Sequence, residues 1–508
     1  MKKQNSNRLW TVFSILLMII LSAAEGFLLW QVWKLKMLPG KYFQILCGAC
    51  LLLTIIAGLL LLRKKQGKWQ KKAGWTRQIV GVLLILLILA GCFFGSRAVG
   101  QVLGTLDAIT TPEKVNVILE IYVRQEDAAQ YLQDTAGYTF AMAQDMPEAV
   151  AEEMRRNLEQ SMGEAPDIVL CTGTVEAVDM LLSGQVDALI LDNSYLLILE
   201  DMEGYEDVES RIRVLHEYII EKEEPQASQP TLSDRPKAEE ITDQPFLLYI
   251  SGNDARRAEL ADGGSDVNIL VLVNPQNHQV LMINTPRDYY VVNPASGNGS
   301  RDKLSHCGLR GIDNCVLAME GLYGIPIDYY ARINFSGFRT LIDAIGGVTV
   351  YSDRAFQTPA GQIYEGENHL DGAQALGFAR ERKNLPGGDN DRGKNQMKLI
   401  SAMINQLSVG NLISNYAEIL ESLEGMFSTS MPAEDIGKLV QFQLTEQPSW
   451  EVLTFAVTGS NGNDMCWAAG GNGYVMYPHD HMVAHAVDLM ERFLQGDVLT
   501  QADMVPQT

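Results

Sequence analysis

The segment HLDGAQALGFARER, residues 369–382, decides how the rest of the chain is interpreted. Asp371 and Gln374 have the Asp-x-x-Gln spacing of a capping box, so a helix is predicted to begin near residue 371. Arg380 and Arg382 lie two apart and would point to opposite sides of a continuing helix. They can reach one ligand only if the helix ends at about residue 380, and the Pro-Gly-Gly turn that follows favours such an end.

A second stretch, GDNDRGKNQ at residues 388–396, adds two further polar groups. Arg392 and Gln396 are four apart and would share one helical face, so both can address the same site. A guanidinium group keeps its charge at physiological pH and binds phosphate oxygens with two parallel hydrogen bonds. Together with Arg287, the arginines of the two stretches predict a site for an anionic diphosphate, in a part of the chain that is otherwise acidic.

Two aspartates suggest a metal ion at the same site. Asp254 follows a β-rich run at residues 246–250, and Asp266 precedes the next β-rich run at residues 267–273. Mg²⁺ commonly takes one or two carboxylates together with phosphate oxygens, so this pair is a candidate Mg²⁺ site, with Mn²⁺ as an alternative ion. The competing interpretation is that each aspartate only caps a turn.

Three other charged residues have two interpretations each. Asp288 either orients Arg287 through a salt bridge, which we favour, or assists deprotonation of an acceptor. Lys303 and Arg332 are either phosphate contacts or solvated charges. Cys307 and Cys315, eight residues apart, either form a disulfide or remain two buried thiols.

These stretches belong to a longer series of motifs. TPRD at 285–288 follows a third β-rich run at 280–284, and IDYYARINF at 327–335 and LIDAIGGVTV at 341–350 come before the arginine stretches. In this order and spacing the motifs closely resemble the catalytic domain of the LytR–CpsA–Psr family, over residues 245–408. The resemblance implies a mixed-sheet α-β-α fold in the α/β class.

The resemblance also implies an activity. Members of this family are membrane-anchored enzymes, mainly of Gram-positive bacteria, that transfer glycopolymers from a polyprenyl-pyrophosphate carrier to peptidoglycan. It implies metal binding by Asp254 and Asp266 and places Arg287, Arg380 and Arg382 together at the pyrophosphate. An apolar cavity is expected to hold the polyprenyl tail. Two positions depart from the pattern: Asn395 stands where many members have arginine, and Val267 where threonine is frequent.

The N-terminal part is a predicted membrane anchor. The chain of 508 residues has a net charge of −22, but residues 1–99 contain 14 Lys and Arg and one acidic residue, Glu25, which leaves −35 for the remainder. Three apolar runs, at 9–33, 43–62 and 78–94, are each long enough to cross a bilayer core. Ten basic residues flank one side of the spans and four the other, so the positive-inside rule predicts a cytoplasmic N-terminus and an extracellular arm after about residue 100.

The predicted extracellular arm divides by composition. Residues 113–220 alternate β-rich runs with helical periods, which indicates a smaller α/β domain that weakly resembles half of an extracellular solute-binding protein. The alternative is an α/β spacer without a ligand. Residues 221–244 are rich in Pro, Ser and acidic residues and are typical of a flexible linker. Residues 409–495 are expected to form a C-terminal extension packed on the catalytic domain.

Other function classes find little support. The strongly acidic arm argues against nucleic-acid binding, because phosphate backbones select basic surfaces. His481 and His485 have the i, i+4 spacing of a zinc motif but lack the Glu of HExxH. Two rivals to the transferase remain: a polyprenyl-pyrophosphate hydrolase, with water as the acceptor, and a membrane-bound sensor or lipid-binding regulator without catalysis.

Overall fold

The protein is described by a computed structural model that divides into two compact units. One unit is Met1–Ala108, Val409–Glu421 and Pro432–Pro448, and the other is Ile109–Ser408, Ser422–Met431 and Ser449–Thr508. The structure describes residues 2–62, 71–110, 115–144, 146–200, 202, 204–222, 240–253, 260, 263–406, 419–420 and 423–506.

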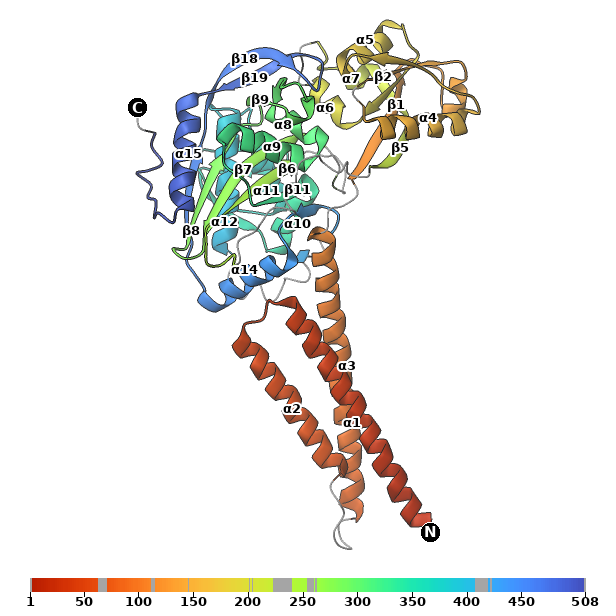
Figure 1. Cartoon of the computed structure of the whole chain (residues 1–508), viewed down its shortest axis with the longest axis vertical. Coiled ribbons are helices and arrows are strands. Elements are labelled where there is room, and N and C mark those ends of the chain that lie inside the picture. The colour runs from red at the N-terminus through yellow and green to blue at the C-terminus, as the bar shows by residue number, and fades with distance from the viewer. Residues whose placement is uncertain are drawn as a thin grey trace. The chain divides into compact units, whose positions relative to one another are not determined.

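The first unit contains three long apolar helices, α1 (Lys2–Leu35), α2 (Gly40–Leu62) and α3 (Lys71–Thr110), which run side by side (Figure 1). All three are long and apolar enough to cross a membrane, which confirms a long apolar helix at each of the three predicted spans. The three helices pack against one another through a small apolar core, whose buried residues are Leu21, Ala57, Leu61 and Ile85. The third helix continues to Thr110, beyond the anchor boundary expected at residue 99, because no proline interrupts residues 95–110.

The first unit also includes α14 (Ala433–Glu446). A Cβ atom at Gly437 would lie 3.0 Å from the backbone oxygen of Leu35, so this helix packs closely against the end of α1. Part of the segment expected to cover the catalytic domain therefore belongs to the helical unit.

The second unit is built around a six-stranded sheet of order β16-β11-β6-β7-β8-β17. Its strands are β6 (Phe246–Asn253), β7 (Ser265–Asn274), β8 (Gln279–Asn284), β11 (Tyr329–Asn334), β16 (Phe427–Thr429) and β17 (Glu451–Ala456). β11 is parallel to β6 and β17 to β8, whereas the other pairs are antiparallel, so the sheet is mixed. Both edge strands follow residue 408, so the sheet extends past the expected domain end.

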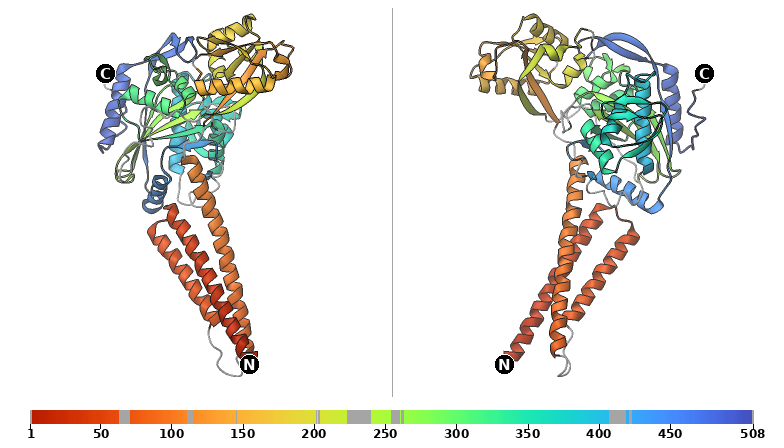
Figure 2. Two further views of the ribbon diagram at one scale, coloured as in Figure 1. Left: turned by 45° about the vertical axis from the view of Figure 1, so that its right-hand side comes forward. Right: turned by 180° about the vertical axis from the view of Figure 1, so that it is seen from behind.

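Helices cover both faces of this sheet, as the views in Figure 2 show. On one face lie α8 (Leu304–Cys307), α9 (Ile312–Tyr323) and α15 (Asp480–Leu494), whose apolar residues share the largest core with the sheet. On the other lie α10 (Phe335–Ala344), α11 (Gly372–Arg380) and α12 (Asp389–Gln406). The predicted α-β-α fold is thereby confirmed. Cys307 and Cys315 are buried thiols of this core that form no disulfide with each other, as the second interpretation predicted.

Four two-stranded antiparallel sheets complete the large domain. They pair β9 (Tyr290–Val292) with β10 (Arg301–Lys303), β12 (Val348–Ser352) with β15 (Gly366–Leu370), β13 (Phe356–Thr358) with β14 (Gly361–Ile363), and β18 (Gly459–Cys466) with β19 (Gly471–Pro478).

The smaller α/β domain has a five-stranded sheet of order β3-β2-β4-β1-β5. Its elements are β1 (Val115–Arg124), β2 (Thr139–Ala143), α4 (Glu148–Met162), β3 (Asp167–Cys171), α5 (Thr174–Ser183), β4 (Ala188–Asp192), α6 (Ser194–Glu200), α7 (Val208–Arg211) and β5 (Ile212–Lys222). β3, β2 and β4 are parallel, whereas β1 pairs antiparallel with β4 and β5. Most of the expected linker, residues 223–239, lies outside the described residues.

The smaller domain shares a core with the β18–β19 hairpin of the large domain. Val178, Leu181 and Leu199 pack in one cluster with Cys466 and Val475. The backbone N–H of Val175 donates to the carbonyl of Ala469 at 3.2 Å. These contacts join the two parts into one compact unit.

Candidate functional site

The helix that carries Arg380 begins and ends where the sequence predicts. The Asp371 side chain accepts a hydrogen bond from the Gln374 backbone N–H (2.8 Å), and the Gln374 side chain accepts one from the Asp371 N–H (3.2 Å). Arg380 is the last residue of α11, and Glu381 is extended, with φ −65° and ψ 127°. The helix therefore ends early enough for Arg380 and Arg382 to reach one ligand.

Asp266 is the centre of an ion cluster drawn from three separate parts of the chain. Its carboxylate Oδ1 accepts a hydrogen bond from Arg287 Nη1 at 2.8 Å, and its backbone oxygen accepts one from Arg392 Nη2 at 2.7 Å. Burial raises the pKa of Asp266, but Arg287, Arg392 and Arg380 outweigh that effect and hold the pKa below its usual value. The carboxylate is therefore ionised and holds the Arg287 guanidinium in place, while the Asp266 backbone oxygen holds that of Arg392.

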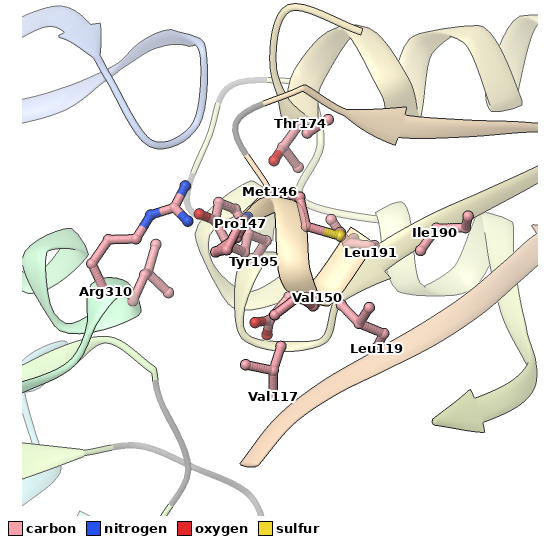
Figure 3. A pocket seen from close by; sticks show the side chains of 13 residues that line it. Val117, Leu119, Met146, Pro147, Val150, Thr174, Ile190, Leu191, Tyr195 and Arg310 are labelled. Carbon is pink, nitrogen blue, oxygen red and sulfur yellow. The ribbon is translucent and has the colours of Figure 1, made fainter. Parts of the chain in front are cut away.

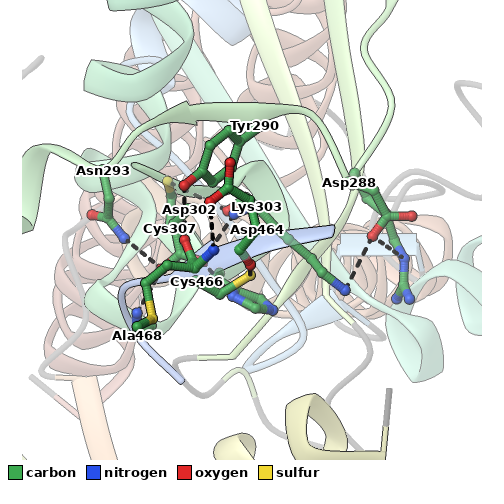
Figure 4. A network of polar contacts seen from close by, with 12 residues as sticks. Asp288, Tyr290, Asn293, Asp302, Lys303, Cys307, Asp464, Cys466 and Ala468 are labelled. Atoms are coloured by element: carbon green, nitrogen blue, oxygen red, sulfur yellow. Dashed lines mark hydrogen bonds and ion pairs between the residues drawn. The ribbon is translucent and has the colours of Figure 1, made fainter. Parts of the chain in front are cut away.

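Asp288 and Lys303 extend this cluster (Figure 4). Asp288 Oδ1 lies 3.7 Å from Arg287 Nε and 3.6 Å from Lys303 Nζ. This geometry agrees with the favoured interpretation, in which Asp288 orients Arg287. Lys303 is only 3% exposed, so the alternative of a solvated charge is wrong for this residue.

Asp302 fixes the backbone beside Lys303. Its fully buried carboxylate accepts hydrogen bonds from the Lys303 N–H (2.9 Å), the Ala468 N–H (2.7 Å) and His306 Nδ1 (2.6 Å) (Figure 4). Cys466 lies beside Asp302 and His306, and burial raises its pKa to about 12, so it is a neutral thiol. Because both Asp302 oxygens already accept hydrogen bonds, we assign this cluster a positioning role.

Asp389 is a site residue that the sequence interpretation missed. It lies in the first turn of α12, and its Oδ1 is 3.2 Å from Arg392 Nε. Burial raises the pKa of Asp389, and the nearby Arg392 only partly opposes this effect. The i, i+3 spacing of Asp389 and Arg392 was the available signal, because it places both on one helical face.

Gly393 is a second residue that was missed. A Cβ atom at this position would lie 2.1 Å from Asn284 Nδ2, so only glycine lets α12 approach the end of β8 this closely. The approach places Arg392 and Gln396 over the sheet, where both are almost fully buried.

An apolar cavity of about 170 Å³ lies between the sheet and helices α10, α11 and α12. Apolar lining residues include Val267, Leu376 and Ile400, and the polar groups in the lining include Arg380 and Gln396. Gln396 donates to the Ala379 carbonyl at 3.2 Å, and the Arg380 guanidinium lies 4.6 Å from the centroid of the Phe335 ring. The expected cavity therefore exists, and Arg380 links it to the charge cluster around Asp266.

The remaining predicted residues are less closely tied to this cluster. Arg382 is half-buried just beyond the end of α11. Arg332 is buried in β11, where Ala331 and Ile333 line the cavity, so strand alternation directs Arg332 to the other face of the sheet. It is therefore not a solvated charge. Asp254 lies outside the described residues.

Fold and site together define a class: an α/β protein with three membrane-length apolar helices and a cluster of arginines next to an apolar cavity. The profile of the LytR_cpsA_psr family matches residues 216–487, more than half of the chain. The chain belongs to that family.

Sequence comparison finds curated relatives in Gram-positive bacteria. The chain is 34% identical over 200 residues to the polyisoprenyl-teichoic acid–peptidoglycan teichoic acid transferase TagU of Enterococcus faecalis, covering 39% of this chain and 65% of the relative. It is 31% identical over 194 residues to the protein of the same name from Bacillus mycoides, covering 38% and 62%. The chain thus spans less than two thirds of either relative.

Among solved structures, the chain is similar to the crystal structure of B. subtilis TagV. The match has 26% identity and a TM-score of 0.41, and covers 50% of this chain and 98% of that one.

Proposed function

We propose that the protein transfers a glycopolymer, as a phosphodiester, from a polyprenyl-pyrophosphate carrier to peptidoglycan at the outer face of the membrane. The relatives named above are teichoic acid transferases, which supports a teichoic acid as the transferred polymer, with a capsule or a similar cell-wall glycan as the alternative. The observation that carries the proposal is the position of Arg380, which lines the apolar cavity and also acts on Asp266.

The cavity and the cluster match the two ends of such a carrier. A polyprenyl chain is apolar, and burial of apolar surface stabilises a complex by about 25 cal/mol per Å² removed from water. The diphosphate is anionic and needs cations that do not lose their charge. Arg287, Arg380, Arg382 and Arg392 supply them, with Lys303 as an additional phosphate contact.

In the proposed reaction, an acceptor hydroxyl oxygen on peptidoglycan attacks the phosphorus next to the glycopolymer. A new P–O bond forms, the P–O bond to the other phosphate breaks, and polyprenyl phosphate leaves with the bonding electron pair. Negative charge builds on the phosphoryl and leaving-group oxygens, and Arg287, Arg380 and Arg382 would stabilise it. Because guanidinium groups are already oriented by Asp266 and Asp288, little reorganisation is required.

The acceptor hydroxyl must lose a proton in this step. Asp266 is a weak base, because the arginines lower its pKa. Asp389 is the better candidate, because burial raises its pKa and thereby its affinity for a proton. The proton would therefore move from the acceptor hydroxyl to the Asp389 carboxylate.

The residues of the cluster fit a hard divalent cation. Oδ1 of Asp288 and Oδ1 of Asp389 are buried oxygens that accept no hydrogen bond from any described residue. Carboxylate oxygens of this kind are the ligands that Mg²⁺ prefers. We propose that Asp266 would hold Mg²⁺, or Mn²⁺, with Oδ1 of Asp288 beside it and together with Asp254 as the family resemblance implies, which leaves Asp389 to act as the base. The bound ion would neutralise diphosphate charge.

The test uses the full chain in lipid nanodiscs with a defined polyprenyl-diphospho-sugar and peptidoglycan oligomers. Mass spectrometry should detect a peptidoglycan oligomer heavier by the phospho-sugar, together with polyprenyl phosphate. Release of free sugar phosphate without a peptidoglycan adduct would instead establish the hydrolase. Carrier binding without turnover would establish the sensor or lipid-binding regulator.

A further inference from the structure

We propose that the smaller α/β domain binds a small aliphatic carboxylate of amino-acid size, in a cavity separate from the proposed transfer site. The cavity measures about 50 Å³. Ala143 and Asp192, the last residues of β2 and β4, line it, as do Pro147 and Thr174 at the N-terminal ends of α4 and α5 (Figure 3). Nothing in the proposed transfer reaction uses it.

The position within the sheet is typical of a ligand site. β2 and β4 are parallel neighbours, but the chain leaves β2 through α4 to reach β3 on the far side of the sheet. Open α/β sheets bind ligands at the carboxyl ends of their strands, where neighbouring connections diverge in this way.

The strongest sign of a ligand is the side chain of Thr174. It is only 2% exposed and lines the cavity, yet its hydroxyl makes no hydrogen bond with any residue that the structure describes. A hydroxyl that lines a cavity can donate a hydrogen bond to a ligand acceptor inside it. Thr174 is also the first residue of the ten-residue helix α5, whose N-cap, Gly173, provides no side-chain cap.

A cation from the large domain completes the polar end of the cavity. Arg310 lines it and directs its guanidinium group toward the side where Thr174 and Pro147 lie (Figure 3). The same guanidinium lies 5.6 Å from the centroid of the Trp467 ring, which restricts its orientation. A threonine hydroxyl, a guanidinium group and a helix N-terminus together favour a carboxylate.

The other walls limit what the carboxylate can carry. They are apolar, with Val117, Leu119, Val150, Ile190 and Leu191 around the cavity. A site for one water needs about 10–15 Å³, so the cavity holds only a few heavy atoms beyond those already packed. A short aliphatic body fits, whereas a sugar or a long acyl chain does not.

Two sources share this chemistry: simple short-chain acids and small α-amino acids. Asp192 should favour amino acids over simple acids. The residue lines the same cavity, and its carboxylate would pair with the α-ammonium group that only amino acids carry. Alanine and propionate differ by that group, and alaninamide lacks the carboxylate.

The experiment titrates the full chain in nanodiscs with D-alanine, L-alanine, propionate and alaninamide. Saturation-transfer NMR detects binding, and calorimetry measures affinity. Propionate or an alanine should bind, and alaninamide should not. Thr174→Val, which keeps the side-chain shape, and Arg310→Gln should each weaken binding by about tenfold or more.

Matched controls isolate the cavity. Thr139→Val removes a hydroxyl at the opposite end of β2, and Arg301→Gln removes an exposed arginine that also lies over an aromatic ring, that of Tyr290. Both should bind like the parent protein. If Asp192→Asn weakens the binding of alanine but not of propionate, the ligand is an amino acid. If this variant binds alanine as tightly as the parent does, the site recognises only the carboxylate.

Two results would overturn the proposal. One is that neither alanine nor propionate binds the parent protein at millimolar concentration. The other is that Thr174→Val and Arg310→Gln, shown to be folded by thermal melting, bind the probe as tightly as the two controls. None of these measurements records glycopolymer transfer. A negative binding result is therefore distinguishable from a failure of the proposed transferase activity.

Discussion

At the scale of single residues, the charge cluster is a set of opposed pairs whose members come from distant parts of the chain. Asp266 holds Arg287 and Arg392, while Asp288 lies between Arg287 and Lys303. The arm beyond residue 99 carries about −35, so an incoming diphosphate meets a repulsive average field. Local cations must reverse that field, which makes the arginines the most sensitive test of the site.

Replacement of Arg380 or Arg382 by alanine should slow transfer by roughly ten- to several-hundred-fold. A charge-assisted hydrogen bond contributes about 1.5–3 kcal/mol, and its loss from the transition state appears directly in the rate. Lysine keeps the charge but loses the two-pronged geometry, so Arg→Lys should be nearly as damaging as Arg→Ala. Transfer rates of folded variants provide the measurement, with exposed Arg354→Ala as the control. Parental rates for both alanine variants would place the pyrophosphate elsewhere.

Asp266→Asn should raise the Mg²⁺ concentration needed for half-maximal transfer. The change removes a charged oxygen ligand and weakens the metal's electrostatic attraction without altering side-chain size. Rates measured over a Mg²⁺ titration give the shift, with Asp353→Asn, an exposed partner of Lys398, as the control. An unchanged Mg²⁺ requirement in the Asp266 variant would remove this residue from the proposed ligand set.

Transfer should fall as pH decreases through the raised pKa of Asp389, because only the ionised carboxylate can accept the acceptor's proton. Arg392 lowers this pKa. Arg392→Gln should therefore raise the pKa further and move the acidic limb of the pH–rate profile to higher pH. Lys394→Gln, which changes an exposed partner of Asp391 on the same helix, should leave the limb in place. If the limb of Arg392→Gln coincides with that of the parent, Asp389 is not the base.

At the scale of elements, α11 and α12 determine where the polar groups stand. The capping box starts α11 so that Arg380 falls at its end, beside the cavity, and α12 carries Asp389, Arg392 and Gln396 at its N-terminal half. The close approach of α12 to β8 at Gly393 holds Arg392 and Gln396 over the sheet.

Gly393→Ala should lower both thermal stability and transfer. Its Cβ would overlap the Asn284 side chain, so either α12 or Asn284 must move, and overpacking of this kind typically costs about 1–3 kcal/mol. Gly321→Ala in α9 is the matched control, because no atom lies within 4 Å of the added Cβ. That variant should be neutral or slightly more stable, since alanine favours helix. Equal melting temperatures for the two variants would contradict the tight approach of α12.

At the scale of the whole molecule, composition separates a basic, apolar N-terminal part from an acidic remainder. The three helices of the first unit present many exposed apolar side chains, among them Ile19, Leu59 and Leu87, as a lipid-facing surface requires. The proposed function needs the acidic remainder outside the cell, where peptidoglycan lies.

A membrane-impermeant thiol reagent should label Ser228→Cys on intact cells and fail to label Gln66→Cys. The reason is the ten-to-four distribution of flanking bases, which places residues 63–77 in the cytoplasm. A background in which Cys47, Cys50 and Cys92 are replaced removes the thiols of the apolar helices. Permeabilised cells control for access to the second site, and labelling of Gln66→Cys on intact cells would reverse the orientation and exclude the extracellular function.

Patterns in the sequence were sufficient to predict much of the fold and part of the candidate site. The length of the apolar runs predicted three helices, the capping box predicted the start of α11, and the motif order predicted a mixed-sheet domain with an apolar cavity. Each depends on residues that are close in the chain, or on a pattern repeated within the family.

Tertiary structure decided what depends on distant partners. The pairing of Asp266 with Arg392 joins residues 126 positions apart, and the burial that raises the pKa of Asp389 comes from packing that no local pattern records. The edge strands β16 and β17, the place of α14 in the helical unit, and the unpartnered hydroxyl of Thr174 were likewise outside the sequence prediction. The physical reason is the same throughout: burial and electrostatic pairing are properties of neighbours in space, and the sequence specifies those neighbours only through the folded chain.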